Sequence, residues 1–456
     1  MWSRDITLLC PTCQVEVEGH IVERDGDLFT RGECAEHGPF EKFFWRDADL
    51  YRESLPPADQ PVLPKGPLDV FDDRVAGYLT TFAIDITNRC NLTCPTCVSQ
   101  AVLTSEVEAS DEDESLDDLL KLIPDYRGKD VKRLPNISLV GGESSLRPDL
   151  PEFIERIIRE KGITPRLNSN GLLLMDEKRL DRLYAAGLRW VILQFDGFTP
   201  EPSIEFRGHD FSKRKLEIIA KLAKKGFFVH LACMVQKGVN DAEVGEILRF
   251  AAKEPNIRRV SFYPRSDIGR FDEPDRPVTH VIDVMHAIEN GTDGQVSADD
   301  VRATKRLGDK LYRLTGNPMF RPRPCIFPFV LMRDGERLVS CHKFFSPGSA
   351  LRNLKAAVKF ARHAPKMLKP DEGRFPSDFL FVNIEKFYDG EAFDVHGAHN
   401  CHHVYLTPEG ALPFCVYNTT IRGKSALQKG GGCGVMPTVP AEKRRVPVEF
   451  KSSSSA

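Results

Sequence analysis

Short apolar runs alternate with amphipathic segments through the middle of the chain. A short run bounded by polar residues predicts a strand, whereas apolar residues that recur every three or four positions predict a helix. The predicted strands are Tyr78–Thr87, Asn136–Val140, Thr164–Asn168, Arg189–Phe195, Phe227–Val235 and Arg258–Pro264. One predicted helix begins at Leu150, and three others cover Asp176–Ala186, Phe211–Lys225 and Asp241–Lys253. This alternation predicts an α/β fold, a partial (β/α)6 barrel whose chemistry lies at the carboxyl ends of parallel strands.

The two ends of the chain carry hairpin patterns instead. Residues 16–33 alternate around Asp25-Gly26, and residues 325–341 and 401–415 each contain two apolar stretches around a turn signal. We therefore divide the chain into four parts. They are a metal-knuckle domain at 1–55, the barrel at 75–275, a C-terminal β-hairpin domain at 276–445 and a disordered tail at 446–456.

Composition narrows the classes of function. The chain has 456 residues, and its 63 basic against 66 acidic side chains argue against nucleic acid as a partner. We find no apolar run long enough to span a bilayer and no secretory signal pattern at the start, so we expect a cytoplasmic protein. In that setting the 12 cysteines are expected to be metal or redox ligands rather than disulfides.

The first cysteine group reads Cys10-Pro-Thr-Cys13 and, twenty residues later, Cys34-Ala-Glu-His37. This spacing is typical of a zinc-ribbon or rubredoxin-like site, which holds zinc or iron. A catalytic metal is the alternative. Because a closed set of three cysteines and one histidine leaves no position for water, we interpret the site as structural.

The second group, Cys90, Cys94 and Cys97, follows the first predicted barrel strand. Three thiolates in one loop can hold one face of an iron–sulfur cluster and leave one iron without a protein ligand. Zinc is the alternative, but it normally requires a fourth ligand, and the sequence offers none nearby.

The later strands also end in polar or glycine-rich sequence. Each of these ends could be an ordinary turn, but three in succession beside the cysteine loop favour a ligand site. The candidate ligand-binding residues are Gly141, Gly142, Glu143, Asn168, Ser169, Asn170, Gln194 and Asp196.

Together the C-x3-C-x2-C loop, the Gly-Gly-Glu motif and the polar strand ends resemble the radical S-adenosylmethionine (SAM) superfamily. The resemblance implies that Cys90, Cys94 and Cys97 ligate a [4Fe-4S] cluster and that Glu143 receives the SAM amine. It implies that Asn168, Asn170 and Asp196 are candidates for contacts to the SAM ribose or carboxylate. Reductive cleavage of SAM would then give a 5′-deoxyadenosyl radical that abstracts hydrogen from an unactivated carbon, and an electron donor such as flavodoxin or ferredoxin is expected.

Two cysteine pairs lie in the predicted C-terminal hairpins. Counting back from a turn at Asp334-Gly335 places Cys341 opposite Pro328. Counting back from a turn at Glu409-Gly410 places Cys415 opposite Val404. Four thiolates at the open ends of two hairpins could hold one auxiliary [4Fe-4S] cluster, with unrelated buried or zinc-bound cysteines as the alternative. The four are Cys325, Cys341, Cys401 and Cys415. Of the remaining two, Cys233 is interpreted as core and Cys433 as a free thiol.

A narrower resemblance rests on GPFEKFFWRDADLY, GGESSLRPDLPEFI, LQFDG and PFCVYNT. These segments resemble the tetraether lipid synthase-like group, which includes the class D radical SAM methylases. The resemblance implies C–C bond formation or methylation at an unactivated sp3 carbon of a lipid-like or other small-molecule substrate. The alternatives are a radical SAM maturase acting on a peptide and a non-catalytic zinc-ribbon binding protein.

One further segment bears on location. In residues 350–369, Leu351, Leu354, Val358 and Ala361 share a helix face flanked by basic residues. Such a helix can lie peripherally on an anionic membrane, here the inner face, or it can pack on the domain with a solvated basic rim. The acidic segment Ser105–Ser115 is interpreted as a solvated loop.

Overall fold

The computed structural model describes most of the chain. The described residues are 2–56, 67–70, 79–104, 113–128, 135–270, 278–316, 320–335, 337–367 and 376–422. Three features of the sequence fall wholly or mostly outside them, namely Cys433, the tail 446–456 and the acidic segment from Ser105 to Ser115.

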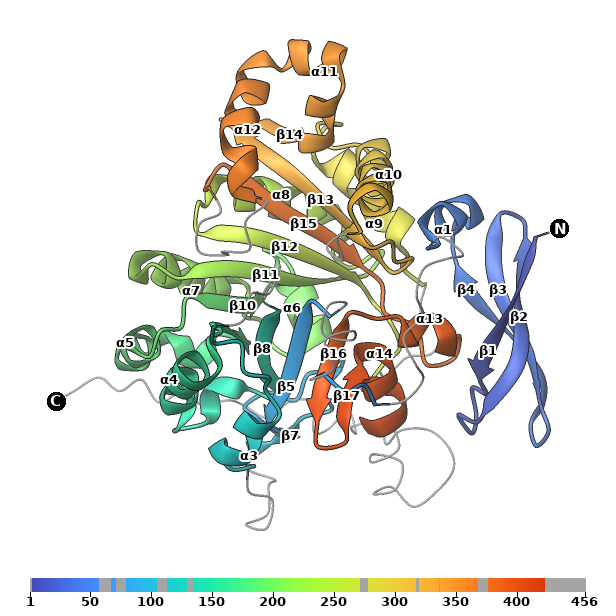
Figure 1. Ribbon diagram of the computed structural model, residues 1–456, viewed down its shortest axis with the longest axis horizontal. Helices are drawn as coiled ribbons and strands as arrows, with labels where there is room; N and C mark the ends of the chain where they lie inside the picture. The colour runs from blue at the N-terminus through green and yellow to red at the C-terminus, as the bar shows by residue number, and fades with distance from the viewer. Residues whose placement is uncertain are drawn as a thin grey trace.

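Six parallel strands form the centre of the molecule in the order expected of a barrel (Figure 1). They are β5 Thr81–Thr87, β8 Asn136–Gly141, β9 Pro165–Ser169, β10 Trp190–Gln194, β11 Phe228–Val235 and β12 Ile257–Pro264. Each agrees with a predicted strand to within three residues at either end. The expectation of a parallel (β/α)6 core is confirmed.

The C-terminal strands extend this sheet to eleven strands. β15 (Phe379–Glu385) pairs in parallel with β12, and β13 (Ile326–Asp334) and β14 (Arg337–Ser340) follow outward as an antiparallel hairpin. At the other edge, β16 (His403–Thr407) pairs in parallel with β5 and is followed by β17 (Gly410–Pro413). Both predicted C-terminal hairpins are therefore present, but they lie at opposite edges of the barrel sheet instead of in a separate sheet.

The sheet curls until its flanking strands meet. Glu385 at the end of β15 and His403 at the start of β16 are separated by six strands in the sheet, yet Glu385 Oε2 lies 3.9 Å from His403 Nδ1. Strands in a barrel are tilted, so the end of one flanking strand can approach the beginning of the other. The side chains of this contact close much of the gap that six strands alone would leave.

The register of both hairpins differs from the predicted one. Asp334 pairs with Arg337 and Thr407 with Gly410, so each turn lies one residue away from the position that we expected. The predicted pairings of Cys341 with Pro328 and of Cys415 with Val404 are consequently wrong. Val404 pairs with Pro413. The ladder of the first hairpin ends at Ser340, before Cys341.

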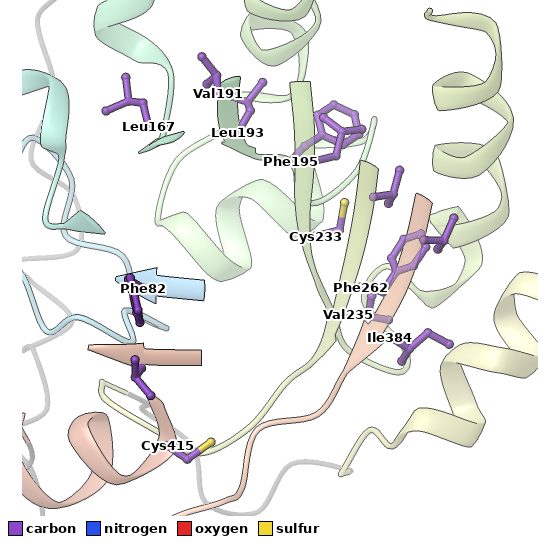
Figure 2. Close-up of a cluster of buried hydrophobic side chains, with 14 of the residues drawn as sticks. Phe82, Leu167, Val191, Leu193, Phe195, Cys233, Val235, Phe262, Ile384 and Cys415 are labelled. Carbon is purple, nitrogen blue, oxygen red and sulfur yellow. The ribbon is translucent and has the colours of Figure 1, made fainter. Parts of the chain in front are cut away.

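Helices cover the outer face of the sheet, and Figure 2 shows apolar side chains of the buried layer between them. Leu193, Phe195 and Phe262 belong to this layer, and Cys233 lies fully buried among them, as predicted. The helices around the sheet are α3 Leu116–Lys121, α4 Leu150–Lys161, α5 Glu177–Ala185, α7 Ser212–Lys225, α8 Val244–Lys253, α9 Val281–Gly291 and α10 Ala298–Thr315. Helix α6 (Pro200–Arg207) lies instead against the cysteine loop, where the Phe206 carbonyl accepts from the Thr96 hydroxyl. Because side chains alternate along a strand, the other half of the strand residues faces inward.

The N-terminal region forms a separate four-stranded antiparallel sheet, drawn in blue in Figure 1. Its strands are β1 Ser3–Leu9, β2 Glu16–Arg24, β3 Asp27–Cys34 and β4 Gly38–Trp45, and α1 Ala48–Ser54 follows. Asp25 and Gly26 join β2 to β3 with φ values of 52° and 83°, the conformation of the tight hairpin turn predicted there. Arg46 fastens this sheet to α9 through a 2.8 Å ion pair with Asp283.

The remaining helices belong to the C-terminal third. They are α11 Pro347–Arg352, α12 Leu354–Met367, α13 Val395–His399 and α14 Phe414–Val416. Within the described residues, none of the helices has the length and apolar character required to cross a bilayer.

Candidate functional site

Four N-terminal side chains converge on one point. Cys10 follows β1, Cys34 ends β3, and their partners Cys13 and His37 lie in the adjoining turns. All four ligand atoms lie within 4.8 Å of one another. The separation of Cys13 Sγ from Cys34 Sγ is 3.8 Å, and that of Cys34 Sγ from His37 Nδ1 is 3.6 Å. These separations fit four donors around one tetrahedral ion, for which Zn–S bonds of about 2.3 Å place two sulfurs about 3.8 Å apart.

The cysteine loop of the barrel is built differently. Cys90 ends β6 (Arg89–Cys90), which pairs with β7 (Val102–Leu103), while Cys94 and Cys97 lie in the loop between these two strands. Burial, followed by the nearby Cys94 thiol, raises the pKa of Cys90. Among the described residues, the N-terminal set alone is arranged to hold a single metal ion. Three thiols of one loop without a fourth ligand fit one face of a multinuclear cluster better than a zinc ion.

Glycines at the end of β8 permit this loop to approach. A Cβ atom on Gly141 would lie 2.1 Å from the carbonyl oxygen of Thr87, and one on Gly142 would lie 2.1 Å from that of Arg89. In place of such a clash, the backbone amide of Gly142 donates to Thr87 and that of Glu143 donates to Arg89, both at 2.8 Å. The two glycines therefore fasten the segment that leads into the cysteines.

One further segment, Gly269-Arg270, also holds the loop. The guanidinium of Arg270 donates to the carbonyl oxygens of Cys94 and Ala101, at 3.2 and 2.9 Å. Gly269 lies so close that a Cβ atom on it would be 2.5 Å from the carbonyl oxygen of Cys97. These contacts were not predicted, because Arg270 is 176 residues from Cys94 and no local motif marks it.

Glu143 joins the ends of β8 and β9. Its carboxylate is buried and accepts from the hydroxyl of Ser169 at 2.7 Å and from the backbone amides of Ser145 and Asn170 at 3.1 and 2.7 Å. The Asn170 amide group in turn donates to the Asn91 side chain in the cysteine loop at 2.8 Å. Three of the predicted ligand-binding residues therefore form one network with the loop.

Asp196 and Gln194 form a second network beside the first. The buried Asp196 carboxylate accepts two hydrogen bonds from Arg207, at 2.8 and 2.9 Å, and one from the backbone amide of Met234 at 3.1 Å. Lys215 reaches in from α7 and donates to the Gln194 side chain at 2.8 Å. Burial lowers the pKa of Lys215 to about 7, although Asp196 opposes this shift.

Lys215 and Arg207 were missed in the sequence. Lys215 shares the apolar face of α7 with Ile218, Ile219 and Leu222, so a lysine at a core position was an available signal. Arg207 ends α6 just before Gly208, and nothing in its local sequence distinguishes it from a surface arginine.

The inner face of the barrel is rich in polar side chains. Asp85 projects from β5, where it alternates with the outward-facing Ile84 and Ile86. Its Oδ2 atom accepts from the Tyr417 hydroxyl at 3.0 Å and pairs with Arg422, whereas its Oδ1 atom is buried without a hydrogen-bond partner. The Oδ1 atom of Asn168, on β9, is also buried without one.

Three of the four C-terminal cysteines approach one another. The Cys401 and Cys325 thiols both contribute to raising the pKa of Cys415, where burial is the largest cause. Cys341 is not brought to them. It lies in a small apolar cluster with Met332, Ala356 and Phe379, and burial alone raises its pKa. The predicted four-thiol set is therefore reduced to Cys325, Cys401 and Cys415 in this structure.

Two family models match the chain. Residues 84–251 match the radical SAM superfamily, and residues 4–46 match the HMPTM N-terminal zinc ribbon domain. The first match spans the first five barrel strands, from β5 to β11, and ends within α8, and the second spans the four-stranded sheet with its metal ligands.

Individual proteins resemble the chain over different lengths. A 7,8-dihydro-6-hydroxymethylpterin dimethyltransferase from Methanocaldococcus jannaschii is 28% identical, over 91% of this chain and 93% of its own length. A GTP 3′,8-cyclase from Helicobacter pylori is 30% identical over a region that covers 42% of this chain and 57% of the cyclase. A crystal structure of a radical SAM methyltransferase from Sphaerobacter thermophilus covers 60% of this chain and 72% of its own, with 15% identity and a TM-score of 0.34.

Proposed function

We propose that this chain, a radical SAM enzyme with an N-terminal zinc ribbon, methylates an unactivated carbon of a pterin-like substrate. The observation that carries the proposal is the similarity to the pterin dimethyltransferase along nine-tenths of both chains. Radical SAM enzymes require a reductant and a substrate, and we propose a flavodoxin or ferredoxin as the donor and the cytoplasm as the location.

The residues of the site divide into three proposed roles. Cys90, Cys94 and Cys97 would hold a [4Fe-4S] cluster, because three thiolates from one loop can bind three irons and leave the fourth iron without a protein ligand. Glu143 would accept the SAM amine through Oε2, which has one protein donor. Gln194 and Asp196, fixed by Lys215 and Arg207, would orient the rest of SAM. When bound, SAM and the reduced cluster supply a radical that abstracts hydrogen from the substrate.

Asp85 is our candidate for recognition of the pterin ring. A pterin carries adjacent N–H donors on one edge, and a buried carboxylate oxygen without a partner is a matching acceptor. Beside it, aromatic rings form a continuous stack that offers flat surfaces for a heterocycle. In the stack, the centroids of Tyr405 and Tyr417 are 4.3 Å apart and those of Phe387 and Phe414 are 4.6 Å apart.

The same polar face is why we place a pterin ahead of the lipid-like substrate expected from the sequence. An alkyl chain offers no donor and would leave the buried Asp85 Oδ1 and Asn168 Oδ1 atoms unpaired, which costs about 1–3 kcal/mol each. A peptide maturase has no observation in its favour, since the N-terminal region is a metal-binding sheet.

The Asp85→Asn variant tests this recognition. Arg422 and Tyr417 both donate to Oδ2, so the asparagine oxygen should stay there and its NH2 group should occupy the Oδ1 position. A donor then replaces the acceptor. We expect the Kd for 7,8-dihydro-6-hydroxymethylpterin, measured by fluorescence titration, to rise about 10- to 100-fold, the value of a charge-assisted hydrogen bond.

Asp283→Asn is the matched control for that variant. Asp283 is also partly buried and paired with an arginine, Arg46, but it lies on α9 outside the barrel. This change should leave the Kd unaltered. Equal pterin affinity of Asp85→Asn and the wild type would remove Asp85 from the proposed site.

The overall function is tested by incubating the anaerobically reconstituted enzyme with SAM, reductant, the dihydropterin and a folate- or pterin-derived one-carbon donor. The donor is required because the hydrogen that leaves in 5′-deoxyadenosine must be replaced by a carbon from another molecule. Mass spectrometry should detect a methylated pterin, and deuterium on the methylated carbon should appear in 5′-deoxyadenosine. SAM cleavage without any pterin product would contradict the substrate class. A change in the lipid extract of cells lacking the protein would then restore the lipid-like alternative.

We further propose that the C-terminal thiols hold an auxiliary [4Fe-4S] cluster through Cys325, Cys401 and Cys415. Cys341 was part of the set expected from the sequence, and its place among Met332 and Phe379 argues against that role. Cys401→Ala should therefore lower the iron content by about four atoms per chain, whereas Cys341→Ala should retain it. Iron loss in both variants would instead favour the four-thiol arrangement.

A further inference from the structure

One surface of the molecule combines exposed apolar side chains with unbalanced positive charge. It is formed by α11 and α12, which project from the top of the molecule in Figure 1. We call this surface the α11–α12 face. Its apolar members are Leu351, Leu354 and Val358, and its basic members are Arg352, Lys355 and Arg362.

The apolar side chains of this face are unusually exposed. Leu351, Leu354 and Val358 are 72%, 57% and 54% exposed. Eight large apolar residues are strongly exposed in the described part of the chain, and these three lie within one stretch of eight residues. Exposed apolar residues that are scattered need no explanation, but a contiguous group marks a contact surface.

The opposite side of α12 already packs against the sheet. Ala356 is buried and Phe360 contacts Phe344 and Phe379, with ring centroids 5.0 and 6.2 Å apart. Lys359 adds an ion pair with Asp378 on the same side. α12 therefore packs on the domain through one face and leaves its basic rim in solvent, as one of the two arrangements expected from the sequence has it. Leu354 and Val358 on α12 and Leu351 on α11 nevertheless remain exposed as an apolar stripe.

Charge on this face is one-sided. Residues 337–370 contain eight arginines and lysines and no aspartate or glutamate, although the whole chain has a net charge of −3. Within the described structure, Arg352, Lys355 and Arg362 form no ion pair. A basic rim around an apolar stripe is the pattern of a helix that lies in the plane of a membrane surface.

We propose that the α11–α12 face docks on an anionic lipid surface, with the apolar stripe at the level of the headgroups and the basic residues on the phosphates. A second copy of this chain is a poorer occupant, because two basic faces would repel each other. An acidic electron donor is also a poorer occupant, because it would have to approach the cysteine loop that follows β5. The α12 helix packs instead on β13, which is separated from β5 by six strands in the sheet. The proposal is independent of which substrate is methylated.

Co-sedimentation of the intact protein with lipid vesicles tests the proposal. We expect binding to vesicles of phosphatidylcholine mixed with phosphatidylglycerol, weak binding to phosphatidylcholine alone, and release by salt. The Lys355→Glu, Arg362→Glu double variant should weaken binding at least about 25-fold, since each lost cation near an anionic surface is worth about fivefold. The Leu351→Ser, Leu354→Ser double variant should also reduce it, because the stripe would no longer insert.

Matched controls lie elsewhere on the surface. Leu314→Ser removes an 82% exposed leucine from α10, and Lys213→Glu reverses an exposed lysine on α7. Both should bind vesicles as the wild type does, and every variant should retain SAM cleavage, which shows that it folds. The proposal is overturned by absence of vesicle binding, by equal loss in the controls, or by a dimer in sedimentation velocity that Leu354→Ser dissociates.

Discussion

Replacement of Cys94 by alanine is expected to abolish the reductive cleavage of SAM. Two thiolates cannot hold a cluster that three thiolates bind with one iron left open for SAM. Cys94 is held centrally in its loop, where the Arg270 guanidinium donates to its carbonyl oxygen and its thiol lies among Arg207, Cys97 and Lys215. Formation of 5′-deoxyadenosine, measured by chromatography after anaerobic reconstitution and reduction, should fall to the level found without enzyme.

Cys233→Ala is the control for that experiment. Cys233 is equally a thiol of the barrel, but it is fully buried in the apolar layer between strands and helices. Its loss should cost some packing free energy while cleavage continues and the cluster absorbance is retained. Turnover by the Cys94 variant would refute the assignment of this loop to the SAM-binding cluster.

Loss of the N-terminal metal should have the second largest effect, and this effect concerns stability. The four-stranded sheet is small, and its strand ends are tied together through Cys10, Cys13, Cys34 and His37. Structural zinc in peptides of this size supplies on the order of 10–16 kcal/mol of apparent binding free energy, which acts as folding free energy. Cys34→Ala should therefore release the metal and expose the amides of residues 3–45 to rapid hydrogen exchange.

The barrel provides the internal reference in the same experiment. Amides of β10 and β11 belong to another sheet, in which neither strand is hydrogen-bonded to the N-terminal sheet, so their protection should change little. His20→Ala is the matched variant, since His20 lies in the same sheet on the exposed side and pairs only with Asp5. Unchanged protection of residues 3–45 in Cys34→Ala would show that the sheet is stable without its metal.

The barrel strands were predictable because each is a local signal. A run such as Phe228–Val235 is apolar, lies between helices and ends in polar sequence, and no distant residue is needed to recognise it. The cysteine loop and the Gly-Gly-Glu motif are local for the same reason. The glycines illustrate the limit, because the clash that requires them involves Thr87 and Arg89, which are more than fifty residues away.

The unpredicted parts depend on contacts between distant segments. Asp85 and Arg422 are 337 residues apart, and neither has a local pattern that announces the pair. Cys341 was grouped with the other C-terminal cysteines because the two hairpins look alike in sequence. The hairpins join opposite edges of the sheet. Of the two cysteines in the first hairpin, only Cys325, which precedes β13, lies near Cys401 and Cys415.

The pairing of β16 with β5 has a consequence for how the protein is made. β5 leads into the cysteine loop, yet its neighbour on one side comes from residues 403–407, more than 300 residues later in the chain. Until the ribosome has synthesised those residues, β5 remains an open edge with unpaired backbone groups, a surface prone to aggregation. The barrel is therefore complete only after β16 has been made, and truncation before β16 should yield insoluble protein rather than a shorter enzyme.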